Sequence, residues 1–332
     1  MDELRKDPTR GHWILIRPKA KPSRQTDCPY CPGAEHLTGP EIAAYRPEGS
    51  TPNGPGWSVR VVPEPDAYFR IEWELVREGV GMFDMINPRG ASELVVESPR
   101  HDDTLATMEP GAIEAVLWMY RDRLLDLKRD GQIRDILVSR HHKKPGVASH
   151  HPYSRVTAIP IVFDETRREL REAREYYQYK RRCLYCDILR QEIAAEERIV
   201  KLTPRFAALV PYAARAPIEV WIVPRQHACS YEDSLTADSA RDLARLLVRG
   251  GSARRDGRGP GAPPVRILRG AEAHVRRPRL RDGPPHRAEP PIAHPPGGLG
   301  HYPRRLPLAH RDRARAGARE SGWRYLRQRD PA

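Results

Sequence analysis

The residues of this sequence best suited to chemistry are cysteines and histidines in a pattern that can bind zinc. A Cys28-Pro-Tyr-Cys31-Pro-Gly segment forms a tight turn that places two thiols close together. Zinc prefers four sulfur and nitrogen ligands in a tetrahedron, and His101 and His151 could complete such a set if the fold brings them to the turn. From spacing alone, the alternative is two reduced, buried thiols and two surface histidines.

A second Cys-x-x-Cys pair, Cys183 and Cys186, repeats this arrangement later in the chain, and His227 follows it. These three residues could form a second zinc site together with one further histidine, or the cysteines could be buried or solvent-exposed thiols. In a reducing compartment such pairs bind metal more often than they form structural disulfides.

The elements that must position these residues are predicted from hydrophobic spacing. Helical spacing predicts helices over about 109–129, 164–177 and 236–249. Short apolar runs predict strands at 13–16, 59–62, 93–97, 133–139, 156–162, 198–202, 207–211 and 218–223. The order of Cys-x-x-Cys, strands, proline-flanked histidine and helix occurs twice, which predicts a duplicated α+β unit.

The net charge of +13 is concentrated in the last quarter of the chain. Residues 251–332 hold 19 Arg, no Lys and seven acidic residues, together with 13 Pro and 11 Gly. The first 250 residues hold 38 basic and 37 acidic side chains, a balance that argues against nucleic-acid binding. We expect the tail to build no core, either because it is a disordered extension or because the reading frame shifts near Arg249.

No targeting signal is evident in the sequence. Residues 1–10 are charged and lack an apolar segment, and no run of 18 apolar residues occurs. The mean hydropathy is −0.69. We therefore expect a cytoplasmic protein that does not enter a membrane.

Several separate segments within about residues 8–249 resemble galactose-1-phosphate uridylyltransferases, the branch of the histidine-triad superfamily with a duplicated fold. The resemblance implies an α+β fold in which two histidine-triad-like units join their antiparallel sheets into a half-barrel flanked by helices. It divides the chain into a unit at 1–180 with the zinc site and the active-site motif, an incomplete unit at 181–250, and the tail at 251–332. The similar stretches are Asp7-Pro-Thr-Arg-Gly-His-Trp-Ile-Leu, Cys28-Pro-Tyr-Cys-Pro-Gly, Gly90-Ala-Ser-Glu-Leu-Val-Val-Glu-Ser-Pro-Arg-His-Asp102 and the block around His151-Pro.

The resemblance implies a UDP-glucose:hexose-1-phosphate uridylyltransferase of galactose metabolism. Such an enzyme transfers UMP between UDP-glucose and galactose 1-phosphate by double displacement, through a uridylyl-histidine. By resemblance, Cys28, Cys31, His101 and His151 are the ligands of a structural Zn²⁺. A UDP-sugar and a hexose 1-phosphate are then the ligands expected, and the family implies a homodimer.

The position of the family's nucleophile carries an unexpected residue. The family's His-Pro-His-Ser-Gln reads His151-Pro-Tyr153-Ser-Arg155 here, so Tyr153 stands where a histidine would attack the α-phosphorus. A neutral imidazole is nucleophilic near pH 7, whereas a phenol with a pKa near about 10 is a poor nucleophile. Three explanations stay open: a sequence error, a non-catalytic nucleotide-sugar-binding paralogue, or altered chemistry through Tyr153.

Other positions marked by the resemblance are also changed. Arg155 replaces a phosphate-binding glutamine, and Glu64 replaces the asparagine of a Val-Pro-Asn contact to the sugar nucleotide. With Arg140, which opens a basic run, they are candidate substrate-binding residues. Glu169 matches by position a glutamate that ligates a second metal in some members. A further hypothesis keeps the fold and changes the substrate to another nucleoside diphosphate sugar, or makes the enzyme a phosphorylase that uses inorganic phosphate.

Overall fold

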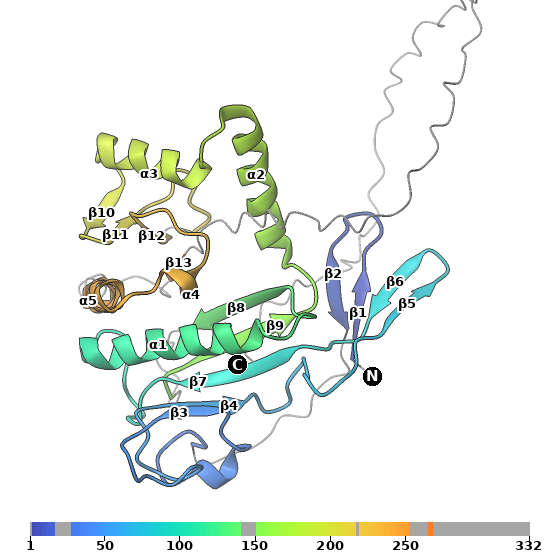
Figure 1. The fold of residues 1–332 in the computed structure, drawn as a ribbon, viewed down its shortest axis with the longest axis vertical. Helices are drawn as coiled ribbons and strands as arrows, with labels where there is room; N and C mark the ends of the chain where they lie inside the picture. The colour runs from blue at the N-terminus through green and yellow to red at the C-terminus, as the bar shows by residue number, and fades with distance from the viewer. Residues whose placement is uncertain (1, 17–27, 141–150, 217–218, 253–264, 268–332) are drawn as a thin grey trace, which may run out of the picture. The chain divides into compact units, whose positions relative to one another are not determined.

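The computed structural model of the chain describes residues 2–16, 28–140, 151–216, 219–252 and 265–267 (Figure 1). All of these residues belong to one unit, Met1–Arg276. The basic run that follows Arg140 lies outside the described residues, and so does the predicted tail apart from its first residues and 265–267.

A five-stranded antiparallel sheet forms the centre of the N-terminal half, with the strand order β3-β4-β7-β9-β8. Its central strands are rich in β-branched residues, which suit a sheet buried on both faces. The strands are β3 (Ala43–Tyr45), β4 (Val59–Pro63), β7 (Ala91–Val96), β8 (Asp135–Arg140) and β9 (Tyr153–Ile159).

Alternate side chains of this sheet point to opposite faces, and each face has its own apolar cluster. Helix α1 (Pro110–Leu127) runs along one face (Figure 1), where Val95 and Val156 pack against Ile113 and Leu117. The other face carries a smaller cluster around Trp57, Val62, Leu94 and Val96, with Tyr30 and Tyr153 at its margin. The strands therefore present one face to the core and the other to the region of the candidate site.

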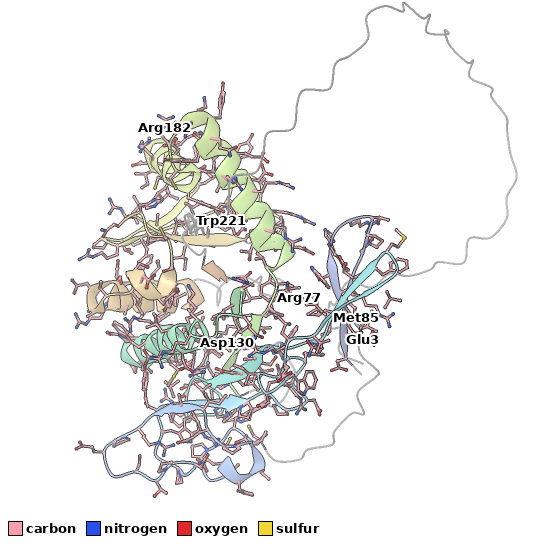
Figure 2. The ribbon with its side chains drawn as sticks, turned by 45° about the vertical axis from the view of Figure 1, so that its right-hand side comes forward. Glu3, Arg77, Met85, Asp130, Arg182 and Trp221 are labelled. Atoms are coloured by element: carbon pink, nitrogen blue, oxygen red, sulfur yellow. The ribbon has the colours of Figure 1, made fainter. Side chains whose placement is uncertain are left out.

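A separate four-stranded antiparallel sheet has the order β2-β1-β6-β5. Its strands are β1 (Glu3–Lys6), β2 (Trp13–Ile16), β5 (Arg77–Val80) and β6 (Phe83–Ile86), and a 3-10 turn, η1 (Glu35–Leu37), precedes β3. Figure 2 shows Glu3 and Met85 on the neighbouring strands β1 and β6, where Leu4 pairs with Ile86.

The C-terminal half begins with α2 (Asp164–Lys180) and α3 (Leu184–Ala195), which Arg182 separates (Figure 2). A sheet of order β10-β11-β12-β13 follows, and α5 packs against α1, so that Leu243 and Leu117 share one core. The remaining elements are β10 (Ile199–Leu202), β11 (Phe206–Leu209), β12 (Val220–Pro224), α4 (Tyr231–Ser234), α5 (Ala237–Ser252) and β13 (Val265–Ile267).

The predicted α+β class, with antiparallel sheets flanked by helices, is confirmed. Both halves contain in order a Cys-x-x-Cys pair, antiparallel strands and a helix, although hydrogen bonds assign the strands of the two halves to separate sheets. The strand expected at 156–162 starts earlier and ends at Ile159, because Pro160 cannot donate a ladder hydrogen bond. Among the described residues, none of the helices has both the length and the apolar character needed to cross a bilayer.

Gly90, just before β7, is required by the close approach of β9. Its φ is +154°, and a Cβ there would lie 2.2 Å from the carbonyl oxygen of Ala158. We expect Gly90→Ala to lower the free energy of unfolding by about 2 kcal/mol or more, because the strands must separate to relieve the clash. Urea denaturation measures this loss.

Gly79→Ala is the matched control, because a Cβ at that position meets no atom within 4 Å. Its free energy of unfolding should change by less than about 1 kcal/mol. Equal losses in the two variants would contradict the close approach at Gly90.

Candidate metal centre and active site

The structure brings together the four residues predicted to bind zinc. One ligand atom from each of Cys28, Cys31, His101 and His151 lies within 4.8 Å of the others. His101 Nδ1 is 3.4 Å from Cys31 Sγ, and His151 Nδ1 is 3.7 Å from Cys31 Sγ and 3.8 Å from Cys28 Sγ. In a tetrahedral zinc site a sulfur and a nitrogen ligand lie about 3.6 Å apart. The four donors could therefore hold a zinc ion.

His151 is fixed in the tautomer that suits a metal ligand. Its Nε2 lies 2.6 Å from the Ser98 carbonyl oxygen, which can only accept a hydrogen bond, so Nε2 carries the proton. The other ring nitrogen, Nδ1, is then unprotonated and faces the two thiols. Hydrogen bonds of this kind orient histidine ligands in metal sites generally.

Burial shifts the ionisation of two members of the cluster. It lowers the pKa of His151, which favours the neutral imidazole that a metal requires. It also raises the pKa of the Cys31 thiol to about 11, and the adjacent Cys28 adds to the effect. A cation bound at this point would reverse the shift of the thiol, because it favours the thiolate.

The turn that carries the two cysteines is anchored by Glu35. The Cys31 carbonyl accepts a hydrogen bond of 3.0 Å from the Ala34 N–H. The Glu35 carboxylate accepts bonds from the Gly33 N–H at 2.8 Å and from the Trp57 indole at 2.9 Å, and it is buried. This arrangement ties the turn to the sheet, since Trp57 belongs to the apolar cluster on that face.

His101 lies in a loop that is held by its own side chains. Ser98 Oγ donates to Asp103 Oδ2 at 2.5 Å and accepts from the Arg100 N–H at 3.1 Å. The loop follows directly from β7, so the position of His101 depends on the end of that strand.

Tyr153 begins β9, two residues after His151, and is half-buried. Its ring lies 5.9 Å from that of Tyr30, which stands between the two cysteines of the turn. Burial raises the pKa of Tyr30 to about 12, with smaller increases from Tyr153 and Glu64. Tyr30 therefore stays neutral at pH 7 and connects the cysteine turn to position 153 by packing.

A buried polar network on the opposite face of the sheet fixes the start of β9. Its centre is Glu97, which is 1% exposed. Tyr120 donates to Glu97 Oε1 at 2.9 Å and lies 2.5 Å from Ser154 Oγ, which also donates to Glu97. The Glu97 N–H donates to the Pro152 carbonyl at 3.0 Å. Ser154 and its neighbour Tyr153 are therefore held in register with the end of β7.

The candidate substrate-binding residues are engaged in ion pairs. Arg140 Nε–H donates to Glu97 Oε2 at 2.6 Å, so this guanidinium belongs to the buried network. Arg155 pairs with Glu64: its Nε–H donates to Glu64 Oε1 at 2.8 Å. The structure thus brings Arg155 and Glu64 together and places Arg140 on the other face of the sheet.

The second predicted cluster also assembles, with three ligands. One ligand atom from each of Cys183, Cys186 and His227 lies within 4.8 Å of the others, and His227 Nδ1 is 3.2 Å from Cys186 Sγ. Burial raises the pKa of Cys186 to about 11. Glu169 lies on α2 and belongs to neither group of candidate ligands.

The buried network and the role of Glu35 were not predicted from the sequence. Glu97 and Glu35 are acids next to apolar strands or turns, and such acids are fully buried only when they are paired. An acidic residue directly after Leu-Val-Val was a usable signal for Glu97. Tyr120 gave no signal of this kind, because its spacing fits an ordinary apolar helix face.

Comparison with known proteins gives consistent relatives, although no protein-family model matches the chain. It is 30% identical to a galactose-1-phosphate uridylyltransferase of Thermotoga maritima over 74% of each chain. It is 27% identical to an ADP-glucose phosphorylase of Arabidopsis thaliana, over 74% of this chain and 73% of that one. A solved structure of a uridylyltransferase is 31% identical, with a TM-score of 0.62 over 74% of this chain and 73% of that one.

The fold and these relatives define a nucleotidyl-transferring enzyme that resembles enzymes of nucleotide sugars. The chain belongs to the galactose-1-phosphate uridylyltransferase family. The homodimer implied by the family resemblance stays a prediction.

Proposed function

We propose that the chain is a UDP-glucose:hexose-1-phosphate uridylyltransferase, which transfers UMP between UDP-glucose and galactose 1-phosphate by double displacement. The observation that carries this proposal is the cluster of four candidate zinc ligands, Cys28, Cys31, His101 and His151. The last of them, His151, stands two residues before position 153. The chain is also 30% identical to a galactose-1-phosphate uridylyltransferase. The reaction site is then the half-buried surface around Tyr153.

The transfer consists of two successive substitutions at the α-phosphorus atom. In the first, Tyr153 Oη forms a bond to the α-phosphorus of UDP-glucose, the phenolic proton is released, and glucose 1-phosphate leaves. In the second, a phosphate oxygen of galactose 1-phosphate attacks the same phosphorus, the bond to Tyr153 breaks, and the phenol recovers a proton. Tyrosine makes the first step slow because little of a phenol is ionised near pH 7.

The proposed metal is a structural zinc ion held by Cys28, Cys31, His101 and His151. Zinc would supply fixed coordination that joins the cysteine turn to the loop after β7 and to the start of β9. The residues of the chain do the remaining positioning, since Ser98 orients His151 and Glu97 holds Ser154. We propose Cys183, Cys186 and His227 as a second metal site.

The zinc proposal predicts a loss of metal in two defined variants. Cys31→Ser and His151→Ala should each lower the zinc content by about one ion per chain, because each leaves only three of the four ligands of a closed structural site. Elemental analysis of the purified variants measures this. Cys229→Ser alters an exposed thiol that belongs to neither cluster, so it is the matched control and should leave the zinc content unchanged. Unchanged zinc in both Cys31→Ser and His151→Ala would refute the assignment.

The role of position 153 predicts a gain of activity on restoring histidine. Tyr153→His should raise the rate of UMP transfer at pH 7 by about 10²-fold or more, because a neutral imidazole is a better nucleophile than a phenol and leaves phosphorus readily when the second phosphate attacks. Burst release of glucose 1-phosphate and trapping of labelled UMP on the protein measure the step.

Tyr153→Phe is the control for this measurement and should abolish any covalent labelling of the native chain. If Tyr153→His gains no activity and binds UDP-glucose without turnover, the chain is a non-catalytic nucleotide-sugar-binding paralogue instead.

A second candidate function, phosphorolysis of a nucleotide sugar, is favoured by the similarity to ADP-glucose phosphorylase. The two functions differ in the acceptor: the transferase needs a hexose 1-phosphate, and the phosphorylase needs only inorganic phosphate. Tyr153→His protein supplied with UDP-glucose or ADP-glucose should turn over only when galactose 1-phosphate is added. Turnover with inorganic phosphate alone would assign the phosphorylase.

A further inference from the structure

The small sheet β2-β1-β6-β5 has one buried face and one open face. Cross-strand partners share a face, and so do alternate residues along a strand, so the register assigns each side chain to a face. Leu4 and Ile86 lie on one face, and both are buried. The opposite face, called the outer face below, consists of Glu3, Arg5, Ile14, Ile16, Glu78, Val80, Phe83 and Met85. Glu3 and Met85 are labelled in Figure 2.

Large apolar side chains are exposed on this outer face. On the hairpin of β5 and β6, Val80 is 64% exposed and Phe83 is 54% exposed, and Met82 in the turn between them is 75% exposed. On β2, Ile14 is 44% and Ile16 is 40% exposed. Together they present on the order of 500 Å² of apolar surface, and an apolar patch of that size on a protein surface often marks an interaction site.

The sequence of β2 indicates that the outer face is covered in the working protein. All four residues of this strand, Trp13–Ile16, are apolar, a pattern typical of strands buried on both faces rather than of strands with one face in water. The structure partly buries Trp13 and Leu15, on the face of Leu4, and leaves Ile14 and Ile16 exposed. A covering element is therefore expected on the side of the two isoleucines.

The composition of the neighbouring chain segments argues against a cover supplied by the same chain. Residues 17–27 follow β2 directly, and they contain no large apolar side chain. Residues 253–264 contain none either. Residues 268–332 are rich in arginine and proline, and their apolar residues follow neither the strand nor the helix period. Such segments offer little apolar surface to match the outer face.

A second copy of the chain matches the outer face in area and in charge. A standard protein interface buries about 800 Å² on each partner, of which a little over half is apolar, so the exposed apolar area is close to what a dimer needs. Arg5 pairs with Glu3 at 2.8 Å, and Glu78 adds one carboxylate. The face is thus close to neutral and does not strongly repel its own copy.

We propose that the outer face of the small sheet binds the same face of a second copy of the chain. The two four-stranded sheets then pack face to face, about 10 Å apart, around a two-fold axis. In such an interface each residue occurs twice, once from each copy. The inference goes beyond the proposed function and does not depend on it, because the outer face contains none of the candidate metal ligands and lacks position 153.

Val80→Asp and Phe83→Asp test this interface. Wild-type protein should sediment at twice the chain mass of 37.9 kDa. Each variant should raise the Kd of the dimer by about hundredfold or more, because the two-fold axis places two unpaired carboxylates in an apolar interface. Sedimentation velocity over a wide range of protein concentrations measures the Kd.

Val200→Asp is the matched control, because Val200 is a valine of similar exposure, 57%, in β10 of a different sheet. It should leave the Kd of the dimer within about twofold. The Tm of all three variants should stay within about 3 °C of the wild type, since each replaced side chain is exposed. This comparison separates loss of the interface from loss of the fold.

Hydroxyl-radical labelling of the wild-type chain tests the same face without a substitution. Labelling of Met82 and Phe83 should rise on dilution through the Kd of the dimer, whereas that of Tyr212, which is 87% exposed, should stay constant. A monomeric wild type, as expected if the tail of the same chain covers the outer face, would overturn the inference. An unchanged Kd in both Val80→Asp and Phe83→Asp, or equal labelling of Met82 and Phe83 in dimer and monomer, would also overturn it.

Discussion

The antiparallel pairing of β7 with β9 is the constraint on which the candidate site depends. Its register sets Val96 opposite Tyr153, so the residues just after β7 lie beside those just before β9. This pairing delivers Ser98 and His101 to His151, although the two segments are about 50 residues apart in the chain. A shift of one residue would send every side chain of β9 to the opposite face and would move His151 away from Ser98 and His101.

The two faces of this sheet differ in the polar residues that they carry. The α1 face holds Glu97 with Tyr120, Ser154 and Arg140 in a buried network, and buried networks of satisfied polar groups specify one arrangement of the backbone. The opposite face carries Tyr153 and Arg155, whose side chains remain partly accessible. The side chains of β9 that fix the backbone and those that remain accessible therefore lie on opposite faces of the strand.

Much of this could be predicted from the sequence, because the relevant signals are local. The Cys-x-x-Cys turns, the proline-flanked histidines and the helical spacing of α1 are local patterns, and the structure brings the four predicted ligand residues together. The partner of a buried charged side chain, in contrast, can lie far away in the sequence, so a local pattern does not identify it. Arg155 and Glu64 were each identified as unusual, but only the strand order β4-β7-β9 shows that they compensate each other. Glu97 was missed for the same reason.

The compensation bears on how the changed residues at 153 and 155 arose. An isolated reading error that introduced Arg155 would leave a guanidinium beside apolar residues, with no reason for a carboxylate at position 64. The observed pair satisfies both charges at hydrogen-bonding distance, and consistency of this kind between distant positions is a property of sequences selected to fold. Arg155 is therefore better explained as a residue selected together with Glu64 than as an error. Because Tyr153 shares its strand and its face with Arg155, the same explanation extends to the tyrosine. The cluster of Cys28, Cys31, His101 and His151 depends on the cysteine turn and on the ends of β7 and β9, so it can persist unchanged while the accessible side chains beside it diverge.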